Sequence, residues 1–334
     1  MKKGDWRRLL IVLGILTLLM AVGGCGSKSG SGSQSAAGHK NIKIFLSLNE
    51  MDTFRKTLVD AASAKATEEG VQLDVADAQG SIEAQVEQLK RAASRGYDVI
   101  VCSAVSVDTA VQLKMSAGEI PIVFFNSCPE DKHLEAGKYV YVGSNEQVAG
   151  QFQAEYVLTQ MPGKQEINVV LIKGPRYHSA TTGRTNGVKQ VLESSGKKIN
   201  YVFEDSANWD TEQARELFAL FLRTGVEADC VICNNDAMAL GVLEAGREAG
   251  MDFGAVPVLG VDATADGCAA IRSGEMAFTV YQSGKGQGEA IVEMAIRMAG
   301  GGDTKDMQGI SEDGKYVWVD FEKVDSGNVS LYGQ

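Results

Sequence analysis

The chain has few basic side chains, few histidines and few prolines. Its 334 residues contain 32 Lys and Arg against 43 Asp and Glu, so the formal net charge is −11. This acidic balance argues against a nucleic-acid partner, because affinity for phosphate backbones depends on clustered Lys and Arg. Only 5 prolines accompany 38 glycines, which indicates many short turns between regular elements. A chain of this length favours two domains or lobes.

Cysteine and histidine are too sparse and too scattered to predict redox or metal chemistry. Cys230 and Cys233 imitate a C-x-x-C motif, but they lie in an apolar run that predicts a buried strand. Three residues along a strand span about 10 Å and point to opposite faces, which a disulfide does not tolerate. Without Cys25 an odd number of cysteines remains, and these cannot all pair. They are Cys102, Cys128, Cys230, Cys233 and Cys268. We expect no cofactor and no metal.

The first 24 residues are typical of an export signal. A basic segment precedes an uncharged apolar stretch at 9–22, which is shorter than the roughly 20 residues that a bilayer-spanning helix needs. VGGC at 22–25 resembles a bacterial lipobox, so Cys25 is the expected lipid anchor; the alternative is a buried cysteine in a transmembrane helix. Residues 25–40 would then be a Gly/Ser-rich tether with a reach of roughly 20 Å. Without residues 1–24 the net charge is −14, so we expect an acidic domain on the outer face of the cytoplasmic membrane.

From residue 41 onward, short apolar runs alternate with longer amphipathic stretches. Near-continuous apolar strands between helices predict parallel sheets that are covered on both faces, as in doubly wound α/β proteins. Two five- or six-stranded sheets fit the number of runs better than one large sheet. The runs are 42–46, 71–75, 99–102, 122–125, 139–142, 167–172, 201–203, 230–233, 256–259 and 277–280.

Polar and aromatic side chains follow seven of these runs. Ligands of such sheets bind beyond the carboxyl ends of the strands, where these side chains should converge. Carboxylates, amides and a guanidinium hydrogen-bond vicinal hydroxyls, and aromatic rings complement the apolar faces of a pyranose. The pattern therefore predicts a sugar pocket. Its candidate ligand residues are Asp52, Phe54, Asn126, His178, Arg184, Trp209, Asn235, Asp262 and Gln282.

Five motifs in this order resemble the galactose/glucose-binding proteins, which belong to the type I periplasmic sugar-binding family of ABC importers. They are PIVFFN at 121–126, YVYVGS at 139–144, WDT at 209–211, NNDAMA at 234–239 and PVLGVD at 257–262. The resemblance covers about residues 41–334. It implies a first lobe of residues 41–144 plus 283–310 and a second lobe of 145–282 plus 311–334. The chain would cross between them near Ser144, near Gln282 and near residue 310, and this three-segment hinge would let the lobes close on a sugar.

The same resemblance implies a role for each candidate residue. Phe54 and Trp209 would sandwich the sugar ring, and the other seven would hydrogen-bond its hydroxyls. Purely structural roles are the alternatives: helix N-caps for Asp52 and Asn235, a loop residue for His178, core for Phe54 and a solvated helix position for Arg184.

Three departures from the family pattern weaken the assignment of the sugar and the metal. Ala180 stands where the family usually has an acid, and Gln282 stands where it usually has Asn. Another pyranose, a pentose or a modified sugar is therefore an alternative to galactose or glucose. Residues 159–167 match the place of a calcium loop in some relatives but lack its acidic alternation, so we expect no calcium.

The resemblance implies a monomeric binding lipoprotein that delivers a monosaccharide to the permease domains of an importer. A sugar sensor for a chemoreceptor or sensor kinase is the alternative that shares the binding chemistry. An enzyme is disfavoured, because residues 284–288 have G-x-G-x-G spacing instead of a dinucleotide fingerprint. Asp52 and Asp262 as a glycosidase pair would predict sugar release from an aryl glycoside. A sugar-responsive repressor is disfavoured because residues 1–40 resemble no DNA-binding helix-turn-helix.

Overall fold

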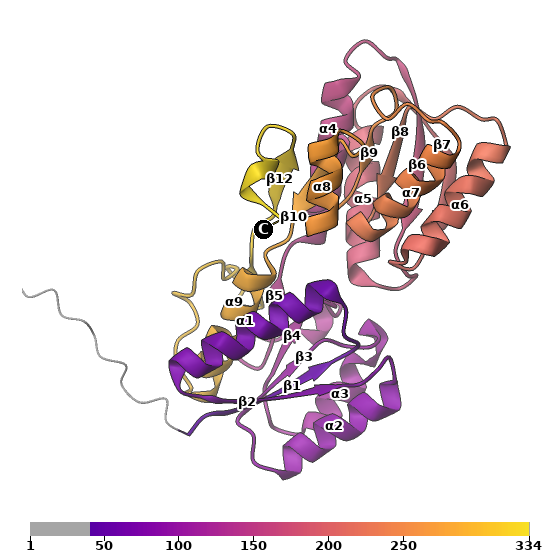
Figure 1. The fold of residues 1–334 in the computed structure, drawn as a ribbon. Helices are drawn as coiled ribbons and strands as arrows, with labels where there is room; N and C mark the ends of the chain where they lie inside the picture. Colours follow the sequence, from indigo (N-terminus) through magenta and orange to yellow (C-terminus); the bar gives the residue numbers. More distant parts are fainter. Residues whose placement is uncertain (1–40, 334) are drawn as a thin grey trace, which may run out of the picture. The chain divides into compact units, whose positions relative to one another are not determined.

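The computed structural model describes residues 41–333, and these form two α/β lobes that each contain a six-stranded sheet (Figure 1). The expected export signal at 1–24, the lipidation site Cys25 and the tether at 25–40 lie outside the described residues. Within the described range, no helix is both long and apolar enough to cross a membrane. The predicted fold class, two doubly wound lobes with parallel sheets, is confirmed.

The first sheet is parallel throughout. Helices α1 (Thr53–Glu69) and α9 (Gly284–Ala299) pack on one face, and α2 (Ile82–Ser94) and α3 (Ala110–Ala117) pack on the other. Alternate residues of each central strand enter these two cores, which is why the strands read as unbroken apolar runs. In spatial order the strands are β11 (Tyr316–Trp318), β5 (Tyr139–Gly143), β4 (Ile122–Phe125), β3 (Val99–Cys102), β1 (Lys43–Leu48) and β2 (Gln72–Asp77).

The second sheet is parallel except at one edge, where β12 runs antiparallel to β10. In spatial order its strands are β12 (Glu322–Asp325), β10 (Phe278–Tyr281), β9 (Val258–Leu259), β8 (Cys230–Cys233), β6 (Glu166–Lys173) and β7 (Lys198–Ser206). One face carries α4 (Glu146–Gln160) and α5 (Ser179–Glu193). The other carries α6 (Thr211–Arg223), α7 (Asp236–Glu248) and α8 (Ala265–Ser273).

The cysteine pair of β8 behaves as its strand position predicts. Cys230 enters the core under α4 and α5, and Cys233 enters the core on the opposite face. Both thiols are fully buried and unpaired, and burial raises their pKa. The interpretation of these cysteines as core residues is confirmed.

The chain passes between the sheets at three places among the described residues. It leaves the first sheet after β5, returns to it after β10, and leaves it again after β11. The first two crossings fall at Ser144 and Gln282, as expected. The third lies between Trp318 and Glu322 and not near residue 310, because β11 pairs in parallel with β5 and so belongs to the first lobe. The prediction that residues 311–334 belong to the second lobe is therefore wrong for β11 and for the loop before it, which belong to the first lobe.

Candidate ligand-binding site

A cavity of about 380 Å³ lies where the carboxyl ends of strands from both sheets meet. Its walls contain all nine residues that the sequence analysis proposes as ligand contacts. These residues follow seven different strands, β1, β4 and β6–β10, so the convergence expected from parallel sheets occurs. The nine are Asp52, Phe54, Asn126, His178, Arg184, Trp209, Asn235, Asp262 and Gln282.

Three of the nine residues are helix N-caps as well as cavity residues. Asp52 accepts the Arg55 amide of α1 at 2.7 Å, and Asn235 accepts the Met238 amide of α7 at 3.0 Å. His178 accepts the Ala180 amide of α5 through Nδ1. The structural alternative for Asp52 and Asn235 is thus correct and compatible with a place in the cavity wall. The capped helix ends also direct their positive dipole ends toward this region, which favours hydroxyl oxygens.

The wall contributed by the first lobe is organised by Arg55. Its Nε donates to Oδ1 of Asn126 at 3.1 Å, and its Nη1 lies 3.0 Å from Oδ2 of Asp52. Nη1 also donates to the backbone oxygen of Glu50 at 3.0 Å. A single guanidinium therefore holds two candidate ligand residues that come from different strand ends.

The wall contributed by the second lobe is organised by Arg184, which is buried. Its Nε donates to Oε2 of Glu146 at 2.6 Å, its Nη1 to the backbone oxygen of Asn234 at 2.7 Å, and its Nη2 to Oε1 of Gln282 at 3.2 Å. Nη1 also lies 3.7 Å from Oδ1 of Asp262. The alternative of a solvated helix position for Arg184 is therefore wrong. Since Glu146 and Gln282 adjoin the first two crossings, Arg184 links the cavity to both of them.

Close packing of α4 on α5 brings Arg184 to Glu146. A side chain on Gly150 of α4 would collide with the backbone oxygen of Arg184, and one on Gly187 of α5 would collide with that of Gln147. Only glycine permits backbones to approach this closely. These two positions thus set the geometry of the buried ion pair.

The carboxyl groups of Asp262, in the second-lobe wall, and of its neighbour Asp236 are strongly desolvated. Burial raises the pKa of Asp262 well above its usual range; Arg184 opposes this shift, and the neighbouring Asp236 and Glu146 add to it. Burial likewise raises the pKa of Asp236, and hydrogen bonds from Thr279 and Thr264 oppose this shift, so that the net pKa is about 6. A bound group that donates a hydrogen bond to Asp262 would stabilise its charged form.

His178 is held neutral between the two arginines. Burial, together with the charges of Arg55 and Arg184, lowers its pKa to about 3. Because Nδ1 accepts the Ala180 amide, Nε2 carries the proton, and Nε2 lies 3.4 Å from Oγ of Ser127 in the first lobe. Its ring meets Trp209 edge-on, with centroids 5.5 Å apart. His178 can therefore present one N–H donor at neutral pH.

The two proposed stacking residues come from different lobes. Phe54 is partly buried against the core of the first lobe, and Trp209 is partly buried against that of the second. The Arg184 guanidinium lies 5.7 Å from the centre of the Trp209 ring. Both rings line the cavity, one from each lobe.

Backbone strain is concentrated around this cavity. Among non-glycine residues, Asn126, Trp209 and Asp262 have φ values of 58°, 66° and 118°. Tyr177, directly before His178, has φ of 67°. Such conformations cost of order 1–3 kcal/mol each and collect at binding sites, where surrounding structure fixes a side-chain direction.

The cavity also contains residues that the sequence analysis did not propose. Ala180, which replaces the acid of the family pattern, is in the wall, so that departure alters the site itself. Arg55 could have been proposed from the sequence, since it lies about one helical turn after the candidate Asp52. The unanticipated lining residues are Thr53, Arg55, Ala180, Thr211, Ala237, Leu240, Thr264 and Asp266.

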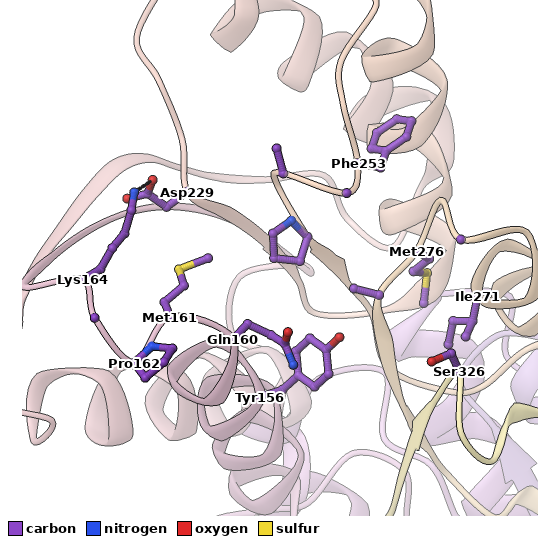
Figure 2. Close-up of a pocket in the computed structure, with 16 residues that line it drawn as sticks. Tyr156, Gln160, Met161, Pro162, Lys164, Asp229, Phe253, Ile271, Met276 and Ser326 are labelled. Carbon is purple, nitrogen blue, oxygen red and sulfur yellow. Dashed lines mark hydrogen bonds and ion pairs between the residues drawn. The ribbon is translucent and has the colours of Figure 1, made fainter.

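A second cavity, of about 600 Å³, lies at the amino ends of the second sheet's strands and includes the loop that was compared with a calcium site (Figure 2). Figure 2 shows Lys164 reaching toward Asp229, with which it forms an ion pair. The ammonium of Lys197 is bound by the backbone oxygens of Met161, Pro162 and Lys164. Lysine ammonium groups thus bind three backbone oxygens of this loop and the carboxylate of Asp229. Within residues 41–333, no group of three or more His, Cys, Asp or Glu side chains is placed to hold a metal.

The carboxyl ends of the strands of two sheets face one polar and aromatic cavity, and the chain crosses three times between the sheets. This arrangement defines a two-lobed binding protein. The periplasmic binding protein domain model matches residues 43–303. The chain belongs to this family.

Proteins of several ligand types are similar to this chain. A Rhizobium meliloti protein named for rhizopine binding is 31% identical over 85% of this chain and 86% of its own length. The D-galactose/methyl-galactoside binding periplasmic protein of Haemophilus influenzae is 29% identical over 81% of this chain and 85% of its own length. An ABC transporter solute binding protein from Bacillus halodurans, solved with bound myo-inositol, has 30% identity and a TM-score of 0.77 over 89% of this chain and 98% of its own. These relatives are solute-binding proteins, and the present chain is a binding protein and not an enzyme.

Proposed function

We propose that this protein binds a neutral six-membered polyhydroxylated ring in the 380 Å³ cavity and delivers it to an ABC importer. The observation that carries the proposal is the convergence of nine polar and aromatic residues from both lobes on one cavity. The volume is near the lower end of the usual range for ligand pockets. It therefore suits a single ring better than an oligosaccharide.

The chemistry of the walls suits hydroxyl groups. Asp52, Asp262 and Asn235 offer acceptors, whereas Arg55 and Arg184 offer only donors. A hydroxyl both donates and accepts, so a ring with several hydroxyls can satisfy both kinds of wall. Phe54 and Trp209 supply apolar faces for the ring carbons.

Two ring types fit this description. A galactose- or glucose-like pyranose is favoured by the sequence motifs and by the galactoside-binding relative. A cyclitol is favoured by the relative with bound myo-inositol. Ala180 in the cavity wall removes a hydrogen-bond acceptor that the galactose/glucose-binding pattern supplies, and this change favours the cyclitol.

Transport follows from the two-lobed arrangement. Only a closed form contacts the ligand from both lobes, so the ligand shifts the population toward that form. We propose that Cys25 carries the lipid, that the protein acts as a monomer on the outer face of the cytoplasmic membrane, and that permease domains recognise its closed form. The importer role is supported by the relative described as an ABC transporter solute binding protein.

Calorimetry on residues 41–334 with D-galactose, D-glucose, myo-inositol, D-ribose and xylitol tests the proposal. We expect at least one six-membered ring to bind with a Kd near the micromolar range, about −8 kcal/mol, and Trp209→Ala to weaken it at least about tenfold. Thermal unfolding without ligand controls for folding of the variant. If no polyol binds, or if Trp209→Ala binds as tightly as the wild type, the assignment of this cavity is wrong.

A further inference from the structure

The sequence analysis does not propose Arg55 as a ligand residue, yet Arg55 lies in the cavity wall. It is the third residue of α1 after the N-cap Asp52, and it is 7% exposed. Its position directly after Phe54 places it between an aromatic candidate and the helix body. A buried guanidinium in a binding cavity requires an explanation, because each unsatisfied N–H would cost stability.

The protein itself satisfies only part of this guanidinium. Nε is bound to Asn126, and Nη1 is bound to Asp52 and to the backbone oxygen of Glu50. Among residues 41–333, Nη2 donates no hydrogen bond to the protein, and it is not one of the fully enclosed polar atoms that lack a partner. Two N–H donors of this cavity residue thus remain accessible and without a protein acceptor.

The other arginine of the cavity differs in this respect. Nε, Nη1 and Nη2 of Arg184 each donate to a protein oxygen, from Glu146, Asn234 and Gln282 respectively. Two of its five N–H groups remain, one on Nη1, which lies 3.7 Å from Asp262, and one on Nη2. Every nitrogen of Arg184 is thus already bound to the protein, whereas Arg55 has one terminal amino group, Nη2, that is bound to none of it.

We propose that Nη2 of Arg55 donates a hydrogen bond to one hydroxyl oxygen of the bound polyol and thereby selects ligands that carry a hydroxyl at that ring position. The same hydroxyl can donate its proton to the adjacent Asp52 carboxylate, which lies against Nη1. A guanidinium cannot accept a hydrogen bond, so a ring lacking oxygen at this position leaves both N–H groups buried and unpaired. This inference rests on the proposed function.

A direct contact and a purely positioning role predict different binding data. If Arg55 acts only by holding Asp52 and Asn126, its loss weakens all analogues of the ligand alike. If Nη2 contacts one hydroxyl, its loss matters for ligands that carry this hydroxyl and hardly matters for the analogue that lacks it. The monodeoxy analogues of the bound ring therefore separate the two roles.

The experiment measures Kd by calorimetry for whichever of D-galactose, D-glucose or myo-inositol binds best, and for its monodeoxy analogues. The proteins are the wild type, Arg55→Met, Arg55→Lys and Asp52→Asn, with Arg91→Met on the exposed face of α2 as a control. We expect Arg55→Met to weaken the parent ligand by about 10- to 100-fold, the usual effect of losing a hydrogen bond from a charged donor. One monodeoxy analogue should bind the wild type and Arg55→Met within about threefold of each other, and Arg91→Met should match the wild type.

Each other outcome has a definite meaning. Equal weakening of the parent and of every analogue by Arg55→Met would overturn the direct contact, as would unchanged affinity. If Arg55→Met does not fold, as judged by circular dichroism, Arg55→Lys decides, because its point charge preserves the pairing with Asp52 but not the second donor. It should lose affinity for the parent and not for the same single analogue, and the opposite result refutes the inference. If the wild type binds no ring at all, the proposed function fails instead.

Discussion

Replacing Arg184 by methionine should lower the free energy of unfolding by about 3–5 kcal/mol, because it leaves the Glu146 carboxylate buried without its cation. Both side chains are less than one-tenth exposed and meet at 2.6 Å, and Arg184 also supplies hydrogen bonds to Asn234 and Gln282. Total stabilities of 5–15 kcal/mol are usual for folded proteins. The variant should therefore remain folded at room temperature, and its ligand affinity can be measured as well.

A double variant separates the cost of breaking the pair from the value of the pair itself. Replacing Glu146 by leucine together with Arg184 by methionine removes both charges and fills the space with apolar groups. Such replacements of buried ion pairs are often neutral or stabilising, so the double variant should regain most of the lost stability. Ligand binding should remain weak, because the cavity still lacks Arg184.

Urea unfolding of the ligand-free protein, followed by circular dichroism, measures these free energies. A loss below about 1 kcal/mol for Arg184→Met would contradict the desolvation of the pair, since that is the range of exposed pairs. A double variant as unstable as Arg184→Met alone would show that Glu146 is not the partner whose isolation is costly. Either result would refute the description of Arg184 as the residue that ties the cavity to the crossings.

Four further predictions follow. The free energy of unfolding should fall as the pH drops from about 6.5 toward about 3, because the unfolded chain protonates His178 in that range while the folded chain keeps it neutral. His178→Asn, which retains an N-cap, should flatten this pH dependence in urea titrations. An unchanged slope would contradict the neutral, buried state of His178. Gly150→Ala should lower the melting temperature through a backbone collision, whereas Gly163→Ala, which has open space around it, should not. Calorimetric titration with calcium should show no micromolar site, since Lys197 binds the backbone oxygens of the loop and Lys164 pairs with Asp229; tight binding would overturn this. Cys25→Ser should shift the protein from the membrane fraction to the soluble fraction, and continued membrane association would argue against the lipid anchor.

Most of the ten predicted strands were predictable because they lie inside a sheet, are buried on both faces and therefore read as unbroken apolar runs. The exceptions are β2 and β7, which lie at sheet edges and are only partly buried. The strands that were missed are short and lie at sheet edges: β11 and β12 have three and four residues. Edge strands carry charges that hide their periodicity, as Glu322 and Lys323 do in β12. Missing β11 displaced the third crossing, since no local pattern shows which sheet a three-residue strand joins.

The candidate site was predictable to the extent that it obeys a topological rule. Residues after parallel strands meet at one edge, so the nine candidates share a cavity although they lie up to 230 residues apart. Arg55 and Glu146 were missed for one reason: in sequence, a charged residue in the first turn of a helix is indistinguishable from a solvated one. Their burial depends on neighbours that are distant along the chain.

The sequence by itself determined the alternation of strands and helices and the chemical types gathered at the strand ends, because both depend on local apolar periodicity. The tertiary structure alone decided which of these groups hydrogen-bond to one another and which remain available to a ligand. Arg184 uses its nitrogens on Glu146, Asn234 and Gln282 because Gly150 and Gly187 let two helices approach closely. One terminal amino group of Arg55 makes no hydrogen bond to the protein. Asp262 has a strained backbone conformation with positive φ. Desolvation and hydrogen-bond saturation are properties of the packed chain, and no single segment carries them.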